Sequence, residues 1–266
     1  MSAIDSARLG ALAPIVARKQ QEAADLQCAA GTLWAKAESM PPARGFVAAL
    51  AGGTIIAEMK RRSPSGGALR GDLDPAAVAR GYADAGAAAL SVLTDGPDFG
   101  GSLDDLVAAR DAAAIPVLRK DFTVDPVQIA EARVAGADAV LLIAAVLEGD
   151  ALLDCLDAAR RFGVDALVEV HDEEEARRAA DSGGTCIGVN NRDLRTLTTD
   201  LGTFARLRRL LPSDAVCVAE SGVRTAADVR RLRDEGADAI LVGEVLMRSG
   251  DAEAACRELV EAARAR

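Results

Sequence analysis

Two short segments, one near each end of the chain, place charged side chains directly after apolar runs of strand length. The first segment delivers Glu58 and Lys60 and continues into the Ser- and Gly-containing stretch 63–67. The second delivers Glu220 and continues with Ser221 and Gly222. Charged groups at strand ends, followed by loops of small residues, are typical of a site that holds an anion.

The spacing of the charged residues indicates where they point. Glu58 and Lys60 are two residues apart, so both side chains lie on the same side of their strand. Similar apolar runs end at Lys120, Glu169 and Glu220. Buried together, such groups are costly unless they pair or meet a ligand, and a cluster of them can separate an acid from a base. A network of structural salt bridges is the alternative, but a purely structural strand edge needs none of these five side chains.

A repeat of about 50 residues supplies the elements that position these groups. In each copy a glycine (Gly86, Gly136, Gly183 or Gly236) follows a helical pattern and precedes an apolar run, as expected of a glycine that ends a helix. The predicted helices include residues 75–85, 103–114, 126–135, 173–182 and 226–235. The predicted strands are residues 55–60, 88–93, 116–120, 139–143, 166–170, 186–190, 216–220 and 239–243.

This alternation of strands and helices predicts a (β/α)8 TIM barrel, in the α/β class, formed as a single domain by residues 1–266. A doubly wound sheet is the competing fold, but the chain has no Rossmann glycine fingerprint and such a sheet would rarely repeat so regularly. Residues 1–50 precede the first strand and have helical spacing, with Trp34 and Phe46 available for packing. We expect them to form an N-terminal helical extension that caps one end of the barrel.

Composition narrows the possible partners. The net charge of −10 argues against nucleic acid as a partner, and no apolar run reaches the roughly 20 residues that a membrane span needs. The five scattered cysteines suit a reducing cytosol, so we expect a cytoplasmic protein, either a monomer or a weak homo-oligomer. His171 is the only histidine, which makes a Ser–His–Asp triad or a multi-histidine metal site improbable. We expect it at the rim of the site.

The loops after residues 216–220 and 239–243 predict where a phosphate would bind. They carry Ser221-Gly222 and Gly243-Glu244. Many barrels bind phosphate through main-chain N–H groups at these two loops, and glycine allows the main chain to approach the anion closely.

At these residues the sequence closely resembles the indole-3-glycerol phosphate synthase family, from about residue 46 to residue 247. The resemblance rests on six stretches: IAEMKRRSPS at 56–65, LRKDF at 118–122, LVEV at 167–170, GVNNRDL at 188–194, AESG at 219–222 and VGEVLM at 242–247. It implies that the chain closes an indole ring on 1-(2-carboxyphenylamino)-1-deoxyribulose 5-phosphate, with loss of carbon dioxide and water, in tryptophan biosynthesis. It implies no cofactor and no metal.

The resemblance also implies roles for single residues. Lys120 would be the general acid that polarises the substrate carbonyl, and Glu169 would be the general base or would assist the dehydration. Lys60 would neutralise the substrate carboxylate and pair with Glu58 or a neighbour. Asn190 and Glu220 would hold substrate hydroxyls and surround the forming indole nitrogen. The implied binding residues are Ser63, Arg192, Ser221, Gly222, Gly243 and Glu244 around the phosphate, and Leu93, Phe99, Phe122, Leu141, Ile143 and Leu194 in an apolar wall against the aryl ring.

One position departs from the family pattern. Many relatives have serine after the glycine at 243, where this chain has Glu244. A carboxylate and a phosphate repel, so we expect the Glu244 side chain to turn away while its main-chain N–H still donates. Two other functions compete with the synthase: a different phosphosugar barrel enzyme, such as an isomerase, and a non-catalytic relative. The presence of Glu58 and Lys60 disfavours the first, and the retention of both lysines and Glu169 disfavours the second.

Overall fold

The computed structural model describes residues 9–64, 66–194 and 196–265. Its centre is a closed parallel barrel of eight strands in which each strand pairs with the next one along the chain and the last pairs with the first. The predicted TIM barrel is therefore confirmed. The barrel strands are β1 (Thr54–Met59), β4 (Ala89–Leu93), β5 (Val117–Lys120), β6 (Ala139–Ile143), β7 (Asp165–Val170), β8 (Cys186–Asn190), β9 (Val216–Glu220) and β10 (Ala239–Val242).

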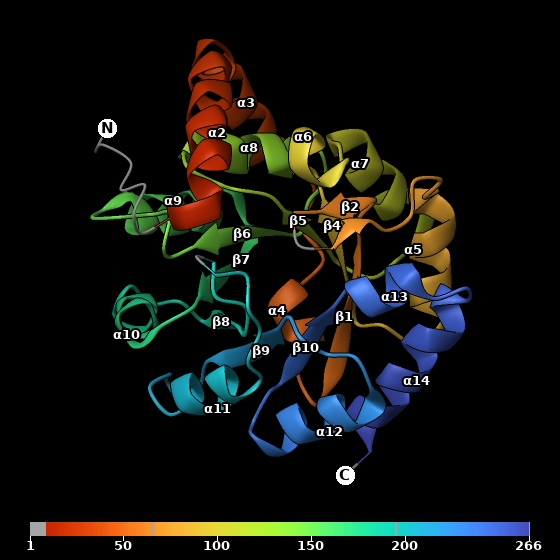
Figure 1. Ribbon diagram of the computed structural model, residues 1–266. Coiled ribbons are helices and arrows are strands. Elements are labelled where there is room, and N and C mark those ends of the chain that lie inside the picture. The colour runs from red at the N-terminus through yellow and green to blue at the C-terminus, as the bar shows by residue number, and fades with distance from the viewer. Residues whose placement is uncertain (1–8, 65, 195, 266) are drawn as a thin grey trace.

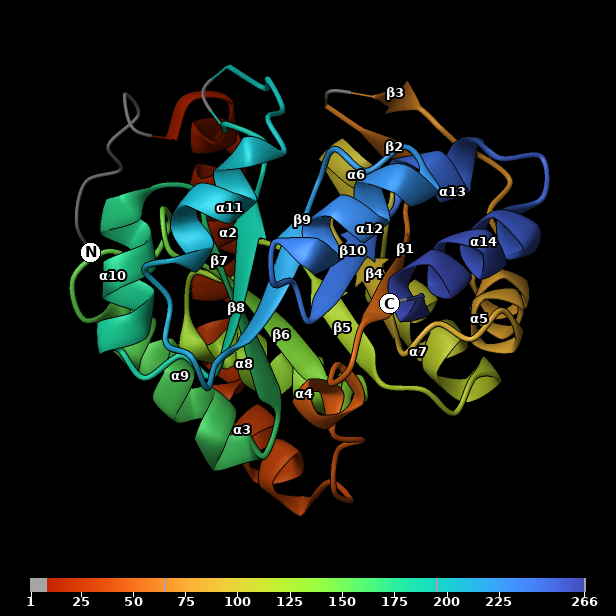
Figure 2. The ribbon, with the colours of Figure 1, turned by 90° about the horizontal axis from the view of Figure 1, so that it is seen from below.

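Helices surround the barrel (Figures 1 and 2). They are α2 (Ala13–Leu26), α3 (Ala30–Ser39), α4 (Phe46–Ala49), α5 (Pro75–Asp84), α6 (Gly96–Phe99), α7 (Leu103–Ala112), α8 (Pro126–Val134), α9 (Ala151–Phe162), α10 (Glu173–Asp181), α11 (Gly202–Arg208), α12 (Ala226–Asp234), α13 (Glu244–Arg248) and α14 (Ala252–Arg264). A hairpin of β2 (Arg62–Ser63) and β3 (Gly67–Ala68) follows β1, and the 3-10 turns Gly10–Leu12 and Gln27–Ala29 adjoin α2. In the described part of the chain, no helix is both long and apolar enough to cross a membrane.

The repeated glycines end helices as the sequence predicts. Gly86, Gly136, Gly183 and Gly236 have φ between 75° and 96°, a conformation that residues with a Cβ rarely adopt. The next residue then donates a hydrogen bond back into the helix, as Ala137 does to the carbonyl of Ala132. Each glycine thereby turns the chain directly into the following barrel strand. The predicted element ends are correct to within two residues.

The barrel interior is filled with aliphatic side chains and is closed at its amino end by α4. Phe46 and Leu50 are fully buried against inward-facing residues such as Ile56 and Leu118. The main-chain N–H of Val47 donates to the carboxylate of Asp165 at the start of β7, which fixes α4 across the amino ends of the strands. The end opposite α4 is left for charged side chains.

The N-terminal extension does more than cap one end. Its segment α4 closes the amino end, while α3 packs outside the barrel against α8 and α9 (Figure 1). On α3, the Trp34 ring lies 6.3 Å from that of Phe162 and below the Arg161 guanidinium, at 4.7 Å. Leu12, just before α2, lines the cavity at the carboxyl end. The extension therefore contacts both ends of the barrel.

Candidate active site

A cavity of about 980 Å³ opens at the carboxyl ends of the barrel strands. The alternation of the strands aims the charged side chains into it, because residues two apart share a face. All eighteen residues that the sequence and the resemblance nominate line this cavity: Glu58, Lys60, Ser63, Leu93, Phe99, Lys120, Phe122, Leu141, Ile143, Glu169, Asn190, Arg192, Leu194, Glu220, Ser221, Gly222, Gly243 and Glu244.

Lys120, at the end of β5, is the centre of the charged cluster. Its Nζ lies 2.7 Å from Glu169 Oε2 on β7 and 3.1 Å from Glu220 Oε2 on β9. Asn190, at the end of β8, donates through Nδ2 to Glu169 Oε1 at 3.0 Å. Both carboxylates are 2% exposed, so water screens these interactions little.

A second pair lies on β1. Lys60 Nζ donates to Glu58 Oε1 at 2.5 Å, and Ser91 Oγ lies 3.4 Å from Glu58 Oε2. Lys60 follows the last residue of β1 and stays partly exposed at the cavity, with 16% of its side chain accessible. Among the described residues, one carboxylate, that of Glu58, balances the positive charge that Lys60 presents to the cavity.

Two glycines make room for the buried carboxylates. A Cβ atom added at Gly188, in the middle of β8, would collide with Glu220 Oε1. One added at Gly243 would lie 2.5 Å from Glu58 Oε1. Gly188 is not among the residues for which a role is predicted from the sequence, although a glycine inside a strand is a recognisable sign that another group approaches closely.

The pKa values of the central groups separate. Burial opposes the charge on Lys120, but Glu169, Glu220 and Glu58 outweigh it and raise the pKa of Lys120, so this amine stays protonated. Burial also opposes the charge on Glu169, yet Lys120 and His171 hold its pKa well below the ordinary value. Glu220 has fewer partners. Burial raises its pKa to about 8, despite the opposing effect of Lys120. The cluster therefore contains a protonated amine, an ionised carboxylate and a carboxylic acid.

The loop after β9 begins with two residues of positive φ. Ser221 and Gly222 both have positive φ, of 65° and 88°. This conformation strains the main chain at Ser221, because serine carries a Cβ. Asn191 Nδ2 donates to the carbonyls of Glu220 and Ser221, at 3.0 and 3.2 Å, and fixes the turn. Strain that a neighbouring side chain sustains in this way is characteristic of functional loops.

Glu244 opens α13 next to this loop and pairs with arginine. Its Oε1 accepts from Arg248 Nε at 3.0 Å, and its Oε2 lies 3.9 Å from an Arg192 nitrogen. Arg248 also donates to the Gly66 carbonyl at 2.7 Å, which ties the loop after β1 to α13. The carboxylate is thus neutralised at the cavity rim, and the expected role of its main-chain N–H stays a prediction. Ser65, in the same loop, lies outside the described residues.

The apolar wall lies on one side of the cavity. The Phe99 and Phe122 rings are 6.1 Å apart and inclined by 43°. Four further leucines that the sequence did not predict line the cavity: Leu12 from the extension, Leu197 and Leu201 from the loop after β8, and Leu241 in β10. None of the four is the last residue of a strand or the residue directly after one, so the pattern of strand ends does not predict them.

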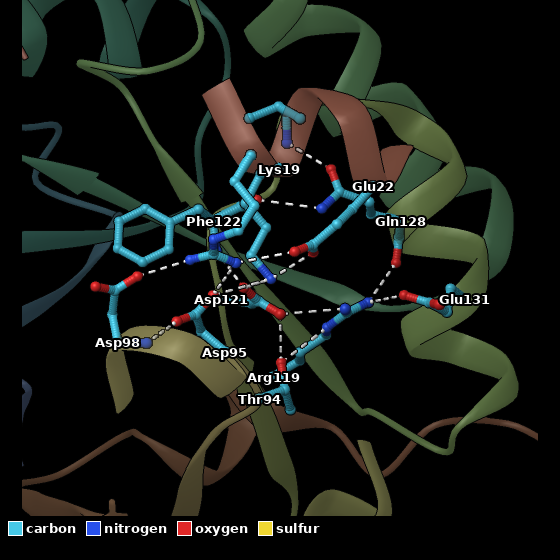
Figure 3. Close-up of polar contacts among 12 residues, drawn as sticks. Lys19, Glu22, Thr94, Asp95, Asp98, Arg119, Asp121, Phe122, Gln128 and Glu131 are labelled. Atoms are coloured by element: carbon cyan, nitrogen blue, oxygen red, sulfur yellow. Dashed lines mark hydrogen bonds and ion pairs between the residues drawn. The ribbon is translucent and has the colours of Figure 1, made fainter. Parts of the chain in front are cut away.

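A separate group of buried charges lies outside the barrel, around Asp121 (Figure 3). Asp121 Oδ1 lies 2.9 Å from Lys19 Nζ on α2, and Asp121 Oδ2 accepts from Thr94 at 2.5 Å and from Arg119 at 3.2 Å. Lys19 also lies 3.2 Å from Asp95. This outer cluster joins the extension to the loops after β4 and β5.

Comparison with known proteins shows the family to which the chain belongs. A sequence model of the indole-3-glycerol phosphate synthase family matches residues 12–259. Proteins of that name from Mycobacteroides abscessus and Rhodococcus jostii are each 49% identical, over 97% and 98% of this chain and 94% and 96% of their own. The protein of that name from Mycobacterium avium is 54% identical over 86% of this chain and 85% of its own.

A solved structure named "Native KDPGal structure" is similar in fold alone. It has a TM-score of 0.56 and 21% identity, and the likeness covers 79% of this chain and 94% of that one. The sequence comparisons show more than a shared fold, because the family model matches nearly the whole chain and the relatives are about half identical to it. By its sequence, this chain belongs to the indole-3-glycerol phosphate synthase family.

Proposed function

We propose that the chain catalyses the closure of the indole ring on 1-(2-carboxyphenylamino)-1-deoxyribulose 5-phosphate, with release of carbon dioxide and water. The observation that carries this proposal is the position of Lys120 between Glu169 and Glu220 at the floor of the cavity, beside an apolar wall. This reaction needs a proton donor at a carbonyl, a second group to help a hydroxyl leave, and an apolar surface for an aryl ring.

Lys120 supplies the proton donor. Its amine is protonated, and it polarises the substrate carbonyl while the aromatic carbon that bears the carboxylate attacks the carbonyl carbon. A carbon–carbon bond forms, the carbonyl oxygen becomes a hydroxyl, and the carboxylate then leaves as carbon dioxide. Two carboxylates beside the amine stabilise its charge before the transfer.

Glu169 serves the later dehydration, or acts as the base. The ring hydroxyl leaves as water with a proton from an acid, while a base removes a proton from the ring system. Glu169 is ionised and lies 2.7 Å from Lys120, so protons can pass between the two groups. Asn190 and the acid Glu220 hold substrate hydroxyls and surround the forming indole nitrogen.

The remaining residues bind the substrate. Lys60 neutralises the anthranilate carboxylate while Glu58 orients it. The phosphate lies by Ser63, Arg192, the turn at Ser221-Gly222, and Gly243 with the N–H of Glu244. The aryl ring packs against Phe99, Phe122 and the leucine and isoleucine side chains of the wall.

We also infer that this enzyme works in the cytoplasm, as a monomer or weak homo-oligomer and without nucleic-acid or membrane partners. The net charge of −10 and five free cysteines, four of them buried, support this environment. Sedimentation of the purified protein tests the oligomeric state, and a stable tetramer would contradict it.

The activity can be tested by mixing purified protein with the carboxyphenylamino-deoxyribulose phosphate and following indole emission. A rising signal, with carbon dioxide released in equal amount, is the expected result. Bound substrate without a signal would leave the barrel and the anion site intact but would overturn the proposed reaction.

A further inference from the structure

His171, the only histidine of the chain, lies behind the proposed base rather than at the rim of the site. It follows the last residue of β7, two residues after Glu169, and only 10% of its side chain is exposed. Its Nε2 is 3.1 Å from Glu169 Oε1 and its Nδ1 is 3.0 Å from Glu175 Oε2. The ring therefore joins a carboxylate of the cavity to a carboxylate at the start of α10.

The ring is fixed from its far side. The main-chain N–H of His171 donates to Glu175 Oε2 at 2.9 Å, and the N–H of Glu175 donates to the capping carboxylate of Asp172 at the same distance. Glu175 is 3% exposed. Because the main chain of His171 also holds the Glu175 carboxylate in place, the imidazole cannot rotate without breaking its Nδ1 contact with Glu175.

A carboxylate lies beside each ring nitrogen: Nδ1 is hydrogen-bonded to Glu175, whereas Nε2 lies 3.1 Å from Glu169 in an ion-pair contact without hydrogen-bond geometry. The imidazolium is the form that both carboxylates favour. Burial opposes this charge, but the carboxylates of Glu169 and Glu175 outweigh it and raise the pKa of His171 to about 9. The ring also borders a second cavity of about 330 Å³ behind Asn190, into which Asp172, Asp193, Asp200 and Arg206 face. Three of these four groups are acidic and favour the positive charge on the His171 ring.

Glu169 and Glu220, the two carboxylates that contact Lys120, differ in the partners of their other oxygen, Oε1. Glu169 Oε1 has Asn190 and His171 beside it, while its Oε2 faces Lys120. Glu220 Oε2 also faces Lys120, but its Oε1 is buried and has no hydrogen-bond partner among the described residues. The imidazolium is the one cation that touches Glu169 and not Glu220 in the described contacts.

We propose that His171 is a positioning residue that acts through Glu169: it holds Oε1 in place and determines that Glu169, rather than Glu220, carries the negative charge beside Lys120. This inference rests on the proposed function for its consequence in catalysis. The pairing itself can be tested without substrate.

The first test uses the fact that the chain has a single histidine. Its ring carbon and nitrogen signals can be assigned in a labelled protein without ambiguity and followed against pH. We expect a doubly protonated ring at neutral pH that titrates near pH 9, and a midpoint lowered by at least one unit, or about tenfold in proton affinity, in Glu169→Gln. A midpoint that is the same in the variant would overturn the pairing, whether or not the protein turns the substrate over.

The second test compares two amide replacements in the ring-closure assay. The amide of His171→Gln can reach the position of Nε2 and contact Glu169, whereas that of His171→Asn reaches only the position of Nδ1. We expect His171→Asn to lose about tenfold or more in kcat and His171→Gln to lose less, because only the former releases Glu169. Both variants remove the cation, so the acid limb of kcat/KM should move to higher pH in both.

A structural role alone would not produce a difference in kcat between the two variants together with a shifted acid limb. Thermal melting of each variant checks the fold. Equal kcat in both variants with an unmoved acid limb would overturn the inference. An inactive wild-type protein would instead contradict the proposed function, and the titration of His171 would still decide the pairing.

Discussion

Three consecutive charged residues at the end of β5, Arg119, Lys120 and the following Asp121, divide between two environments. Arg119 and Asp121 point outward and join the outer cluster with Lys19 (Figure 3). Lys120 instead joins the cavity cluster through Glu169. Burial does not distinguish the two, since Asp121 is 3% exposed and Glu220 is 2% exposed.

The two clusters differ in how completely their charges are satisfied. In the outer cluster, Asp121 has Lys19 and the Phe122 N–H at one oxygen, and Thr94 and Arg119 at the other. In the cavity, Glu220 Oε1 has no described partner. A buried polar atom without a partner is costly, and a ligand or a proton can remove that cost. The carboxylate whose oxygens all have partners, Asp121, thus lies where the extension docks. The carboxylate with an unpartnered oxygen, Glu220, lies in the cavity of the proposed active site.

The largest effect is expected from the inner side of β5. Lys120→Ala should lower turnover by about 10²-fold to 10⁴-fold, because it removes the general acid. Steady-state indole emission measures this loss, with thermal melting as a check of the fold. Normal turnover in this variant would refute the assigned role of Lys120.

On the outer side, the expected loss is of stability. Lys19→Met keeps the length and the apolar stem but leaves Asp121 and Asp95 without their amine, and should lower the free energy of unfolding by about 3 kcal/mol. Urea titration measures this, with Lys36→Met on the exposed side of α3 as the matched control. If the two variants were equally stable, the outer cluster would not hold the extension in place.

Gly188→Ala tests the space around Glu220. The added methyl group collides with Glu220 Oε1, so we expect a loss of about 1–3 kcal/mol in unfolding free energy together with reduced turnover. Gly31→Ala on α3, where nothing lies within 4 Å of the new Cβ, should leave stability unchanged or raise it. A fully active and stable Gly188→Ala would show that the carboxylate can move aside at no cost.

The smallest effect concerns pH. Glu220 keeps its proton in the folded protein up to a pKa of about 8, above its value in the unfolded chain. The folded state therefore binds more protons in this window, and stability falls as pH rises through it, by at most about 1.4 kcal/mol per pH unit. Glu220→Gln removes this contribution, so its urea midpoint should fall less than that of the wild type between about pH 6 and about pH 7. If the urea midpoints of the variant and the wild type fell in parallel, Glu220 would not be the group that holds the extra proton of the folded state.

The sequence predicts the barrel well because its signals are local. An apolar run after a helix-ending glycine marks a strand wherever the rest of the chain lies, and the last residues of that strand, such as Glu169 and Glu220, then lie at one end of the barrel. The residues nominated from strand ends and from the family resemblance all line the cavity for this reason.

Contacts between distant segments could not be predicted in this way. The ion pair of Lys19 with Asp121 depends on how α2 lies against the barrel, and the position of Leu12 depends on the same docking. The contact of His171 with Glu169 is a different case. Their two-residue spacing is the same as that of Glu58 and Lys60, and the same argument from strand alternation would have placed them on one side.

Trp34 is the only tryptophan of the chain, and it lies on α3, in contact with α9 and not in the lining of the cavity. Its emission is therefore an intrinsic optical reporter for one event, the docking of the N-terminal extension on the outside of the barrel. In a denaturation experiment, a change in tryptophan fluorescence that precedes the loss of helical circular dichroism would mean that the extension detaches before the barrel opens. Superimposed curves would mean that extension and barrel unfold as one cooperative unit.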